Sequence, residues 1–420
     1  MGQGRWWKIT IPKTPIGLAN NTRSTGIHLP TFEGWSTRPS MEKEMKELSK
    51  TGAFAILLTS SLTIMVGTVI APSLTEIARN LGFTANPGWL ITLPSLGVVL
   101  FAPLMGKLID KYGAYVVICG GLVPYAFIGN LGSLLHNPYL LIIDRLLLGA
   151  ATAAVQASST SMIADFFHGE KRMKMMARQG MSIEIGGVIF LSIGGILGEI
   201  HWKLPFLIYL IGVICLCMIL LFVPQTDIVK EIGAVPARAP KKVITKEILG
   251  ICISSMFAML LFFVAFVGLP QYLPAAFGFS ESDTGYFMSF ISLTAVVFAW
   301  LMPKVSSILG QNHIVPLGFI LFGIGLFCLS IATAQLVLLT AALAMGAGFG
   351  FTVPLLNHQT VEQSDATNRG KNLSYYAMGI FGGQFLSSFV GLLSSDIQTV
   401  FKIAATVAIL VSITLFYRQK

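Results

Sequence analysis

The sequence predicts an all-α membrane protein, with twelve transmembrane helices in two pseudo-symmetric six-helix bundles. Three observations predict this fold class: the composition, a series of twelve apolar runs, and an internal repeat. Over half of the 420 residues are apolar (54%) and 11% are charged, and the mean hydropathy is +0.75. A soluble domain of this size cannot cover its surface with so few polar residues.

Each apolar run is long enough to cross a bilayer, which takes about 20 residues of α-helix. No run shows the short alternating pattern of a transmembrane strand, whereas a helix satisfies its own backbone hydrogen bonds in lipid. The expected spans are 53–75, 88–106, 114–135, 138–163, 177–199, 204–223, 248–270, 284–302, 313–333, 335–356, 373–395 and 398–417.

The positive charges orient the chain. With the N-terminus in the cytoplasm, 24 of the 28 Lys and Arg residues fall on the cytoplasmic side, three lie outside, and Arg145 lies within a span. This asymmetry predicts cytoplasmic termini and a cytoplasmic central loop. The net charge of +9 therefore indicates anionic lipid as the partner, and no interleaved basic and aromatic surface indicates nucleic acid.

The expected organisation has four parts. Residues 1–50 form a cytoplasmic N-terminal segment, 51–224 the first bundle, 225–246 a cytoplasmic linker, and 247–420 the second bundle. The first forty residues are polar and basic, and no apolar core follows them, so we expect disorder rather than a signal peptide. The charged stretch that begins at Met41 suggests that the native chain starts there. We expect a multi-pass protein of the bacterial inner membrane.

The second half of the chain repeats the first with an offset of 197 residues. Gly113 aligns with Gly310, and Gly149 aligns with Gly346. Six spans followed by six equivalent spans in the same orientation predict parallel repeats about an axis along the membrane normal. That symmetry is typical of transporters with a central site at the repeat interface.

Two sequence segments resemble signatures of the major facilitator superfamily. Gly106–Gly113, with the sequence GKLIDKYG, resembles its loop between spans two and three, and Arg145 followed by Gly149 resembles its second signature in span four. The resemblance covers about residues 50–418. It implies that Gly106, Asp110, Lys111 and Gly113 form a gate that braces the two halves when the cytoplasmic side is closed.

Span five departs from the drug/proton antiporter branch, which the chain otherwise resembles most. That branch carries Gly-Pro-x-x-Gly-Gly here, and residues 190–195 read Phe-Leu-Ser-Ile-Gly-Gly. The missing proline would have bent the helix. Gly194 and Gly198 still provide a small-residue contact surface.

Arg145 is a charge inside span four and therefore a candidate for substrate binding. Helical spacing puts it on a polar stripe that also contains Gly149, Thr152, Gln156 and Ser159. The alternative is a structural ion pair. Its neighbour Asp144 should point about 100° away, so we expect Asp144 near the outer rim, paired to another helix or involved in proton coupling.

Glu184 lies near the middle of span five with no basic residue within its own turn. A carboxyl buried without a cation favours its protonated form, which suits a proton carrier. The alternative is a structural hydrogen bond to a neighbouring span. The difference in depth argues against direct pairing of Glu184 with Arg145.

Other cavity candidates are weaker. Thr63, Asn357, Tyr375 and Gln384 are polar residues in or near spans, and we expect them to contact substrate. Span seven is crowded with Phe262, Phe263, Phe266 and Tyr272. Aromatic walls are typical of ligand sites, but each of these rings is more often a packing or lipid-facing residue.

No ATP-binding or metal-ligand pattern occurs, so we expect a transporter without cofactor or metal rather than an enzyme. We expect the five cysteines to be small apolar packing residues. The favoured function is proton-coupled efflux of a small amphipathic or organic compound by alternating access, in a protein that works as a monomer. The alternative is a proton-coupled symporter that imports an organic acid bound by Arg145. A third class is a receptor that binds without transport.

Overall fold

The computed structural model describes residues 48–225, 245–364 and 369–418. The expected N-terminal segment, the Met41 start and most of the linker lie outside these residues. Residues 47–420 form one compact unit. Within the described ranges, twelve helices are long and apolar enough to cross a membrane, and no strand occurs there. The fold class expected from the sequence is confirmed.

The first half of the chain contains α1 (Lys50–Thr68), α2 (Leu74–Asn80), α3 (Trp89–Tyr112), α4 (Ala114–Leu131), η1 (Gly132–Leu134), α5 (Pro138–Phe166), α6 (Gly169–Ile200), α7 (Leu204–Leu207), η2 (Ile208–Leu210) and α8 (Ile211–Phe222). The second half contains α9 (Lys246–Phe277), α10 (Glu281–Leu309), α11 (Gln311–Ile331), α12 (Gln335–Glu362), α13 (Arg369–Val390), η3 (Gly391–Leu393) and α14 (Ile397–Arg418). The short helix α2 lies between two membrane-spanning helices, whereas α7, η2 and α8 together make up one span, Leu204–Phe222.

The spanning helices alternate in direction, which gives the helical unit two ends. We call the end with residues 69–88, 201–203, 278–280 and 394–396 the distal end. The opposite end, where α1 starts and α14 finishes, is the terminal end. The positive-inside pattern predicts that the terminal end is cytoplasmic.

The internal repeat seen in the sequence is also a repeat of backbone conformation. Gly113 and Gly310 end α3 and α10 with φ angles of 85° and 82°, a region that favours glycine. A Cβ on Gly149 would collide with the carbonyl oxygen of Pro94, and one on Gly346 would collide with that of Ile291. Both pairs are offset by 197 residues, so the two halves use the same close helix contacts.

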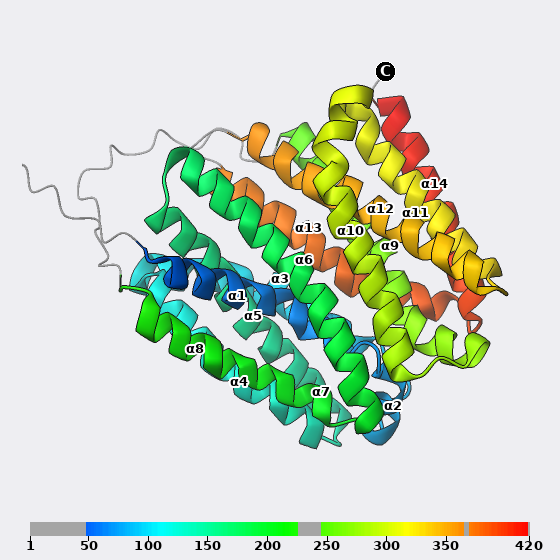
Figure 1. Ribbon diagram of the computed structural model, residues 1–420, viewed down its shortest axis with the longest axis horizontal. Helices are drawn as coiled ribbons and strands as arrows, with labels where there is room; N and C mark the ends of the chain where they lie inside the picture. Colours follow the sequence, from blue (N-terminus) through cyan, green and yellow to red (C-terminus); the bar gives the residue numbers. More distant parts are fainter. Residues whose placement is uncertain (1–47, 226–244, 365–368, 419–420) are drawn as a thin grey trace, which may run out of the picture. The chain divides into compact units, whose positions relative to one another are not determined.

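The two halves meet along two pairs of helices. α6 packs along α10, and α3 packs along α13, and Figure 1 shows α6 and α10 side by side. Around these pairs, each half packs its remaining helices against its own neighbours, such as α11 against α12 and α14. The two halves are therefore in contact mainly through these two helix pairs.

Candidate functional site

A cavity lies between the two halves, bordered by five helices. It is lined by side chains from α1, α6, α9, α10 and α12. The lining residues are Ile64, Thr68, Glu184, Gly187, Met259, Phe262, Phe263, Phe266, Ser292 and Phe349. The centre of a water-sized sphere can occupy about 20 Å³ of it, which is room for roughly one water molecule.

Glu184 is the acidic residue of this lining, and α6 carries it half-buried to the cavity wall. Among the described residues, its carboxyl has no ion-pair or hydrogen-bond partner. A charged carboxylate is costly in such surroundings unless a proton or another cation neutralises it. The arrangement can therefore take up a proton or attract a cation.

Four of the nine other lining residues are phenylalanines. Phe262 is their centre, with its ring centroid 4.5 Å from those of both Phe266 and Phe349. Phe263 stacks on Phe266 at 5.7 Å. Such rings offer an apolar surface together with a negative face that attracts cations. Phe262, Phe263 and Phe266 thus belong to the cavity, although packing was the more usual expectation for each; Tyr272 instead donates a hydrogen bond to the Ala332 carbonyl.

Small residues let α6 approach α10 near the distal end. Gly195 and Gly285 face each other, and a Cβ on either would lie 2.6 Å from a backbone carbonyl oxygen of the other helix. Ser192 and Ser289 share a hydrogen bond of 2.8 Å, and Ser289 Oγ donates to the Val188 carbonyl at 2.9 Å.

A second set of contacts joins α3 to α13. Ser95 Oγ donates to Gln384 Oε1 at 2.6 Å, and Thr92 hydrogen-bonds Ser388 one turn nearer the distal end. These four side chains are buried. Gln384, expected to contact substrate, therefore has its side-chain oxygen occupied by the other half of the protein.

At the distal end of α9, a proline leaves one backbone carbonyl without its usual hydrogen-bond donor. Pro274 has no N–H, so the carbonyl of Pro270 lacks the donor that a helix normally supplies. The hydroxyl of Thr75, on α2, donates to this carbonyl at 3.1 Å. The hydrogen bonds from Thr75, Thr92, Ser95 and Ser289 all lie in the distal half, so they hold the two halves together on that side of the cavity.

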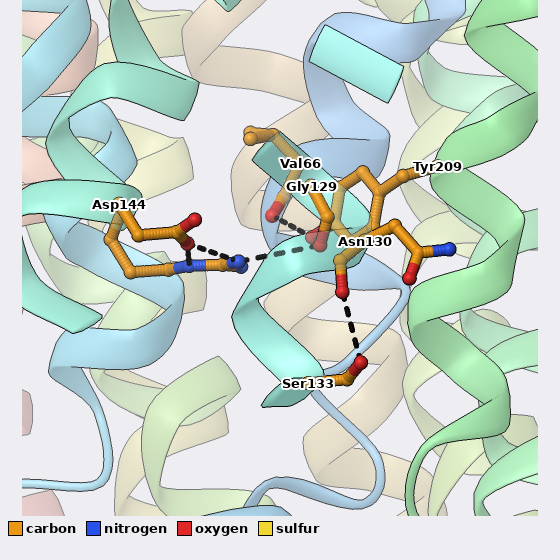
Figure 2. Close-up of polar contacts among 7 residues, drawn as sticks. Val66, Gly129, Asn130, Ser133, Asp144 and Tyr209 are labelled. Atoms are coloured by element: carbon orange, nitrogen blue, oxygen red, sulfur yellow. Dashed lines mark hydrogen bonds and ion pairs between the residues drawn. The ribbon is translucent and has the colours of Figure 1, made fainter. Parts of the chain in front are cut away.

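Arg145 and Asp144 lie away from the cavity, inside the first half, and they bind each other. Arg145 Nε and Nη2 both donate to Asp144 Oδ2, at 2.9 and 2.7 Å, and Nη2 also reaches the carbonyl of Gly129 at 3.4 Å. Both residues are at least 95% buried. Figure 2 shows Asp144 with Gly129 and Tyr209 nearby.

The expectation that Asp144 points away from Arg145 is therefore wrong for the side chains. The Cβ directions of adjacent helical residues do differ by about 100°, but the long arginine side chain folds back and returns its guanidinium to the neighbouring carboxylate. Asp144 pairs with the residue next to it in the chain, Arg145, rather than with a residue of another helix. Glu184 and Arg145 do not pair with each other, as their difference in depth led us to expect.

The remaining sequence candidates are dispersed. Thr152 and Thr63 are buried and donate to carbonyls of their own helices, those of Leu148 and Ser60. Gln156 and Tyr375 are half-buried and Asn357 is exposed; none of the three lines the cavity. The structure thus brings one of the expected site residues, Glu184, together with aromatic side chains and leaves the others outside.

The signature loop lies at the terminal end. Gly113 makes the turn between α3 and α4, and Asp110 and Lys111 are exposed in the last turn of α3. The Lys111 ammonium lies 4.9 Å from the centre of the Tyr112 ring. A Cβ on Gly106 would meet no atom within 4 Å. Within the described residues, Asp110 makes no ion pair, so a brace between the halves is not formed in this conformation.

Several lining residues were not expected from the sequence. Ile64, Thr68, Gly187, Met259, Ser292 and Phe349 complete the cavity. Three of them have a pattern that the sequence shows, because Gly187 follows Glu184 by three residues and so shares its helix face, and Ile64 and Thr68 are four apart on α1. The other three residues have no comparable feature.

Comparison with known proteins shows which family this chain belongs to. A sequence profile of the Major Facilitator Superfamily matches residues 56–250 and 251–420. The multidrug transporter protein MdtP of Bacillus subtilis is 29% identical over 182 residues, which are 43% of this chain and 34% of that protein. The quinolone resistance protein NorA of Staphylococcus aureus is 28% identical over 142 residues, 34% of this chain and 36% of that protein. The matched segments thus span about a third of these relatives.

Solved structures show the same fold at low sequence identity. The nucleoside transporter NupG superposes with a TM-score of 0.73 at 14% identity, over 88% of this chain and 100% of that chain. The peptide transporter POT superposes with a TM-score of 0.70 at 13% identity, over 87% of this chain and 94% of that chain. The profile matches both halves of the chain, and the described residues contain twelve helices of spanning length. This multi-pass membrane protein therefore belongs to the Major Facilitator Superfamily.

Proposed function

We propose that this transporter exports a small amphipathic organic compound, preferentially a cation, in exchange for protons. The observation that carries the proposal is the cavity between the halves, where the carboxyl of Glu184 faces an aromatic wall with no cationic partner among the described residues. Antiport needs a group that a proton and a substrate neutralise in turn. Glu184 is that group in this proposal.

The wall chemistry supports a substrate with a flat apolar body and a positive charge. Phenylalanine faces attract both aromatic rings and cations, and a carboxylate attracts cations directly. The resemblance to MdtP and NorA, whose names describe multidrug transport and quinolone resistance, agrees with the export of toxic organic compounds.

The size of the cavity supports movement of the two halves. Ligand sites for drug-sized molecules hold about 300–1,000 Å³, whereas this cavity has room for roughly one water molecule at its centre. Substrate entry therefore requires the halves to move apart. In the proposed cycle, the distal contacts open as the terminal end closes, and Asp110 and Lys111 then brace the closed terminal end against the second half.

The proposed orientation follows from charge. With the terminal end in the cytoplasm of a bacterial cell, most Lys and Arg residues face the anionic cytoplasmic surface. The sealed distal end then faces outward, and the conformation described here is the one that receives cargo from inside. A single chain contains the entire cavity, so we propose a functional monomer.

Import of an organic acid is less compatible with this geometry. The cation proposed to hold such a substrate, Arg145, is occupied by Asp144 and lies outside the cavity. An anionic substrate would instead meet the Glu184 carboxyl, and like charges repel at close range.

Proton movement in inverted membrane vesicles tests the proposal. Vesicles that contain the transporter are acid-loaded, and a pH-sensitive dye reports release of protons when ethidium, an aromatic cation, is added. We expect ethidium to collapse the gradient with the native chain and not with Glu184→Gln. Glu76→Gln is the control, because it removes a carboxyl outside the cavity, paired with Arg79. Equal collapse with Glu184→Gln would refute the assignment of proton exchange to Glu184.

A further inference from the structure

The last two turns of α1 accept hydrogen bonds from two tyrosines of other segments. Tyr209 Oη donates to the carbonyl of Val66 at 2.7 Å, and Tyr125 Oη donates to that of Leu62, one turn earlier, at 2.6 Å. Val66 is among the last four residues of α1, where carbonyls run out of N–H donors from their own helix. The Tyr209 hydroxyl thus caps α1 from outside.

The Tyr209 ring is itself held by its surroundings. A Cβ on Gly129 would lie 2.4 Å from Tyr209 Cγ, so only a glycine at this position of α4 leaves room for the ring. Tyr125 packs edge-on against it at 5.8 Å. Figure 2 shows Tyr209 beside Gly129 and Val66, the residue whose carbonyl it binds.

The guanidinium of Arg145 also lies near the Tyr209 ring. It lies 5.9 Å from the centre of the Tyr209 ring and 5.6 Å from that of Phe206. Two hydrogen bonds from Arg145 to Asp144 fix the guanidinium in place. The absence of a side chain on Gly132 is required too, because a Cβ there would lie 2.0 Å from Arg145 Nη2. The buried ion pair therefore holds an aromatic ring rather than a substrate.

The segment that Tyr209 caps belongs to the cavity wall. Ile64 and Thr68 lie two residues on either side of Val66, and both line the cavity that contains Glu184. A Cβ on Gly187, one turn from Glu184, would be 3.7 Å from Ile64 Cγ1. A shift of the α1 backbone at Val66 would therefore change the wall that faces Glu184.

We propose that Tyr209 is a positioning residue for the cavity, and that the Asp144–Arg145 pair acts through it. The chain of contacts runs from Asp144 to Arg145, to the Tyr209 ring, to the Val66 carbonyl, and so to Ile64 and Thr68. The importance of this wall for transport rests on the proposed function, but the mechanical role of Tyr209 does not.

The test compares Tyr209→Phe, which removes one hydroxyl and keeps the ring, with Tyr272→Phe. Tyr272 is a matched control because it is also buried and also donates to a carbonyl, that of Ala332, in the other half and outside the cavity. Hydrogen exchange of the purified full chain reports opening of the last turn of α1. The rate at which Glu184 reacts with dicyclohexylcarbodiimide, followed by peptide mass spectrometry, reports the cavity wall.

We expect Tyr209→Phe to speed amide exchange at residues 65–71 about fivefold, which corresponds to the loss of about 1 kcal/mol. Labelling of Glu184 should change by about twofold or more, with Tyr272→Phe like the native chain in both measurements. Unchanged exchange at α1, or unchanged labelling of Glu184, overturns the proposal. Neither readout requires a transported substrate, so failure of ethidium to drive proton release would leave this result interpretable and would count against the proposed function alone.

Discussion

The contact between Gly195 and Gly285 predicts that one added methyl group shifts the balance between conformations. In Gly195→Ala, the new Cβ would lie 2.6 Å from the Glu281 carbonyl oxygen and 3.1 Å from Gly285 Cα. Both are backbone positions that cannot rotate away. α6 and α10 must therefore separate at the distal end.

The magnitude follows from the hydrogen bonds that this separation breaks. Ser192 with Ser289, Ser289 with the Val188 carbonyl, and the Ser282 amide with Glu199 all join α6 to α10 near this contact. Hydrogen bonds between membrane helices average about 0.6 kcal/mol in double-mutant cycles. Loss of the three weakens the distal seal by about 2 kcal/mol, which shifts the ratio of sealed to open molecules roughly 30-fold.

Distances between spin labels at the distal end measure this shift. Labels at Asn80→Cys and Ser395→Cys occupy exposed positions in the first and second halves, in a background in which the five native cysteines are replaced. We expect the longer-distance population to grow strongly in Gly195→Ala. Gly180→Ala is the control on the same helix, because its Cβ would meet nothing within 4 Å. Identical distance distributions in the native chain and Gly195→Ala would refute the idea that this contact holds the distal seal.

Two further predictions concern the cavity and a helix cap. A Cβ on Gly187 has ordinary contacts of 3.7 and 3.8 Å with Ile64 and Ser292, so Gly187→Ala should retain ethidium transport. Gly187→Leu should extend into the cavity and abolish transport in a protein that still elutes as a folded species; full transport by Gly187→Leu would contradict the location of the pathway. Asp396 caps α14 through Thr399 and Gln398, and the hydrogen bond from the Thr399 hydroxyl holds the pKa of Asp396 below its usual range. Its stabilising effect is then present above the unfolded-state pKa of about 3.9 and is lost as pH falls through the lower folded-state pKa. Asp396→Ala should accordingly lower the Tm at pH 7 and converge with the native chain in strong acid; a Tm difference that stays constant with pH would exclude this origin.

The fold was predictable because it depends on features that recur along the chain. Apolar runs of spanning length define the helices, and the repeat at an offset of 197 residues reappears as matching backbone angles at Gly113 and Gly310. The position of Glu184 was predictable for a related reason. A lone carboxyl in an apolar span is tolerated where it faces protein or a cavity rather than lipid.

The rest of the site depends on side-chain paths and on packing, which sequence spacing does not determine. Arg145 has the helix position of a cavity residue, but its flexible side chain returns to Asp144. Gln384 has the polarity of a substrate ligand, but Ser95 of the other half satisfies its side-chain oxygen. The chain has 29 phenylalanines, and only the packing of α9 against α12 determines that Phe262 and Phe349 meet at the cavity.

In the proposed exchange, a proton and a cationic substrate use the Glu184 carboxyl in turn. Proton release on substrate binding can be measured with the purified transporter in weakly buffered solution, with a pH indicator that follows additions of ethidium. We expect binding to the native chain to release protons, and Glu184→Gln to bind ethidium without releasing them. Equal proton release from both proteins would show that the two ligands do not share this carboxyl.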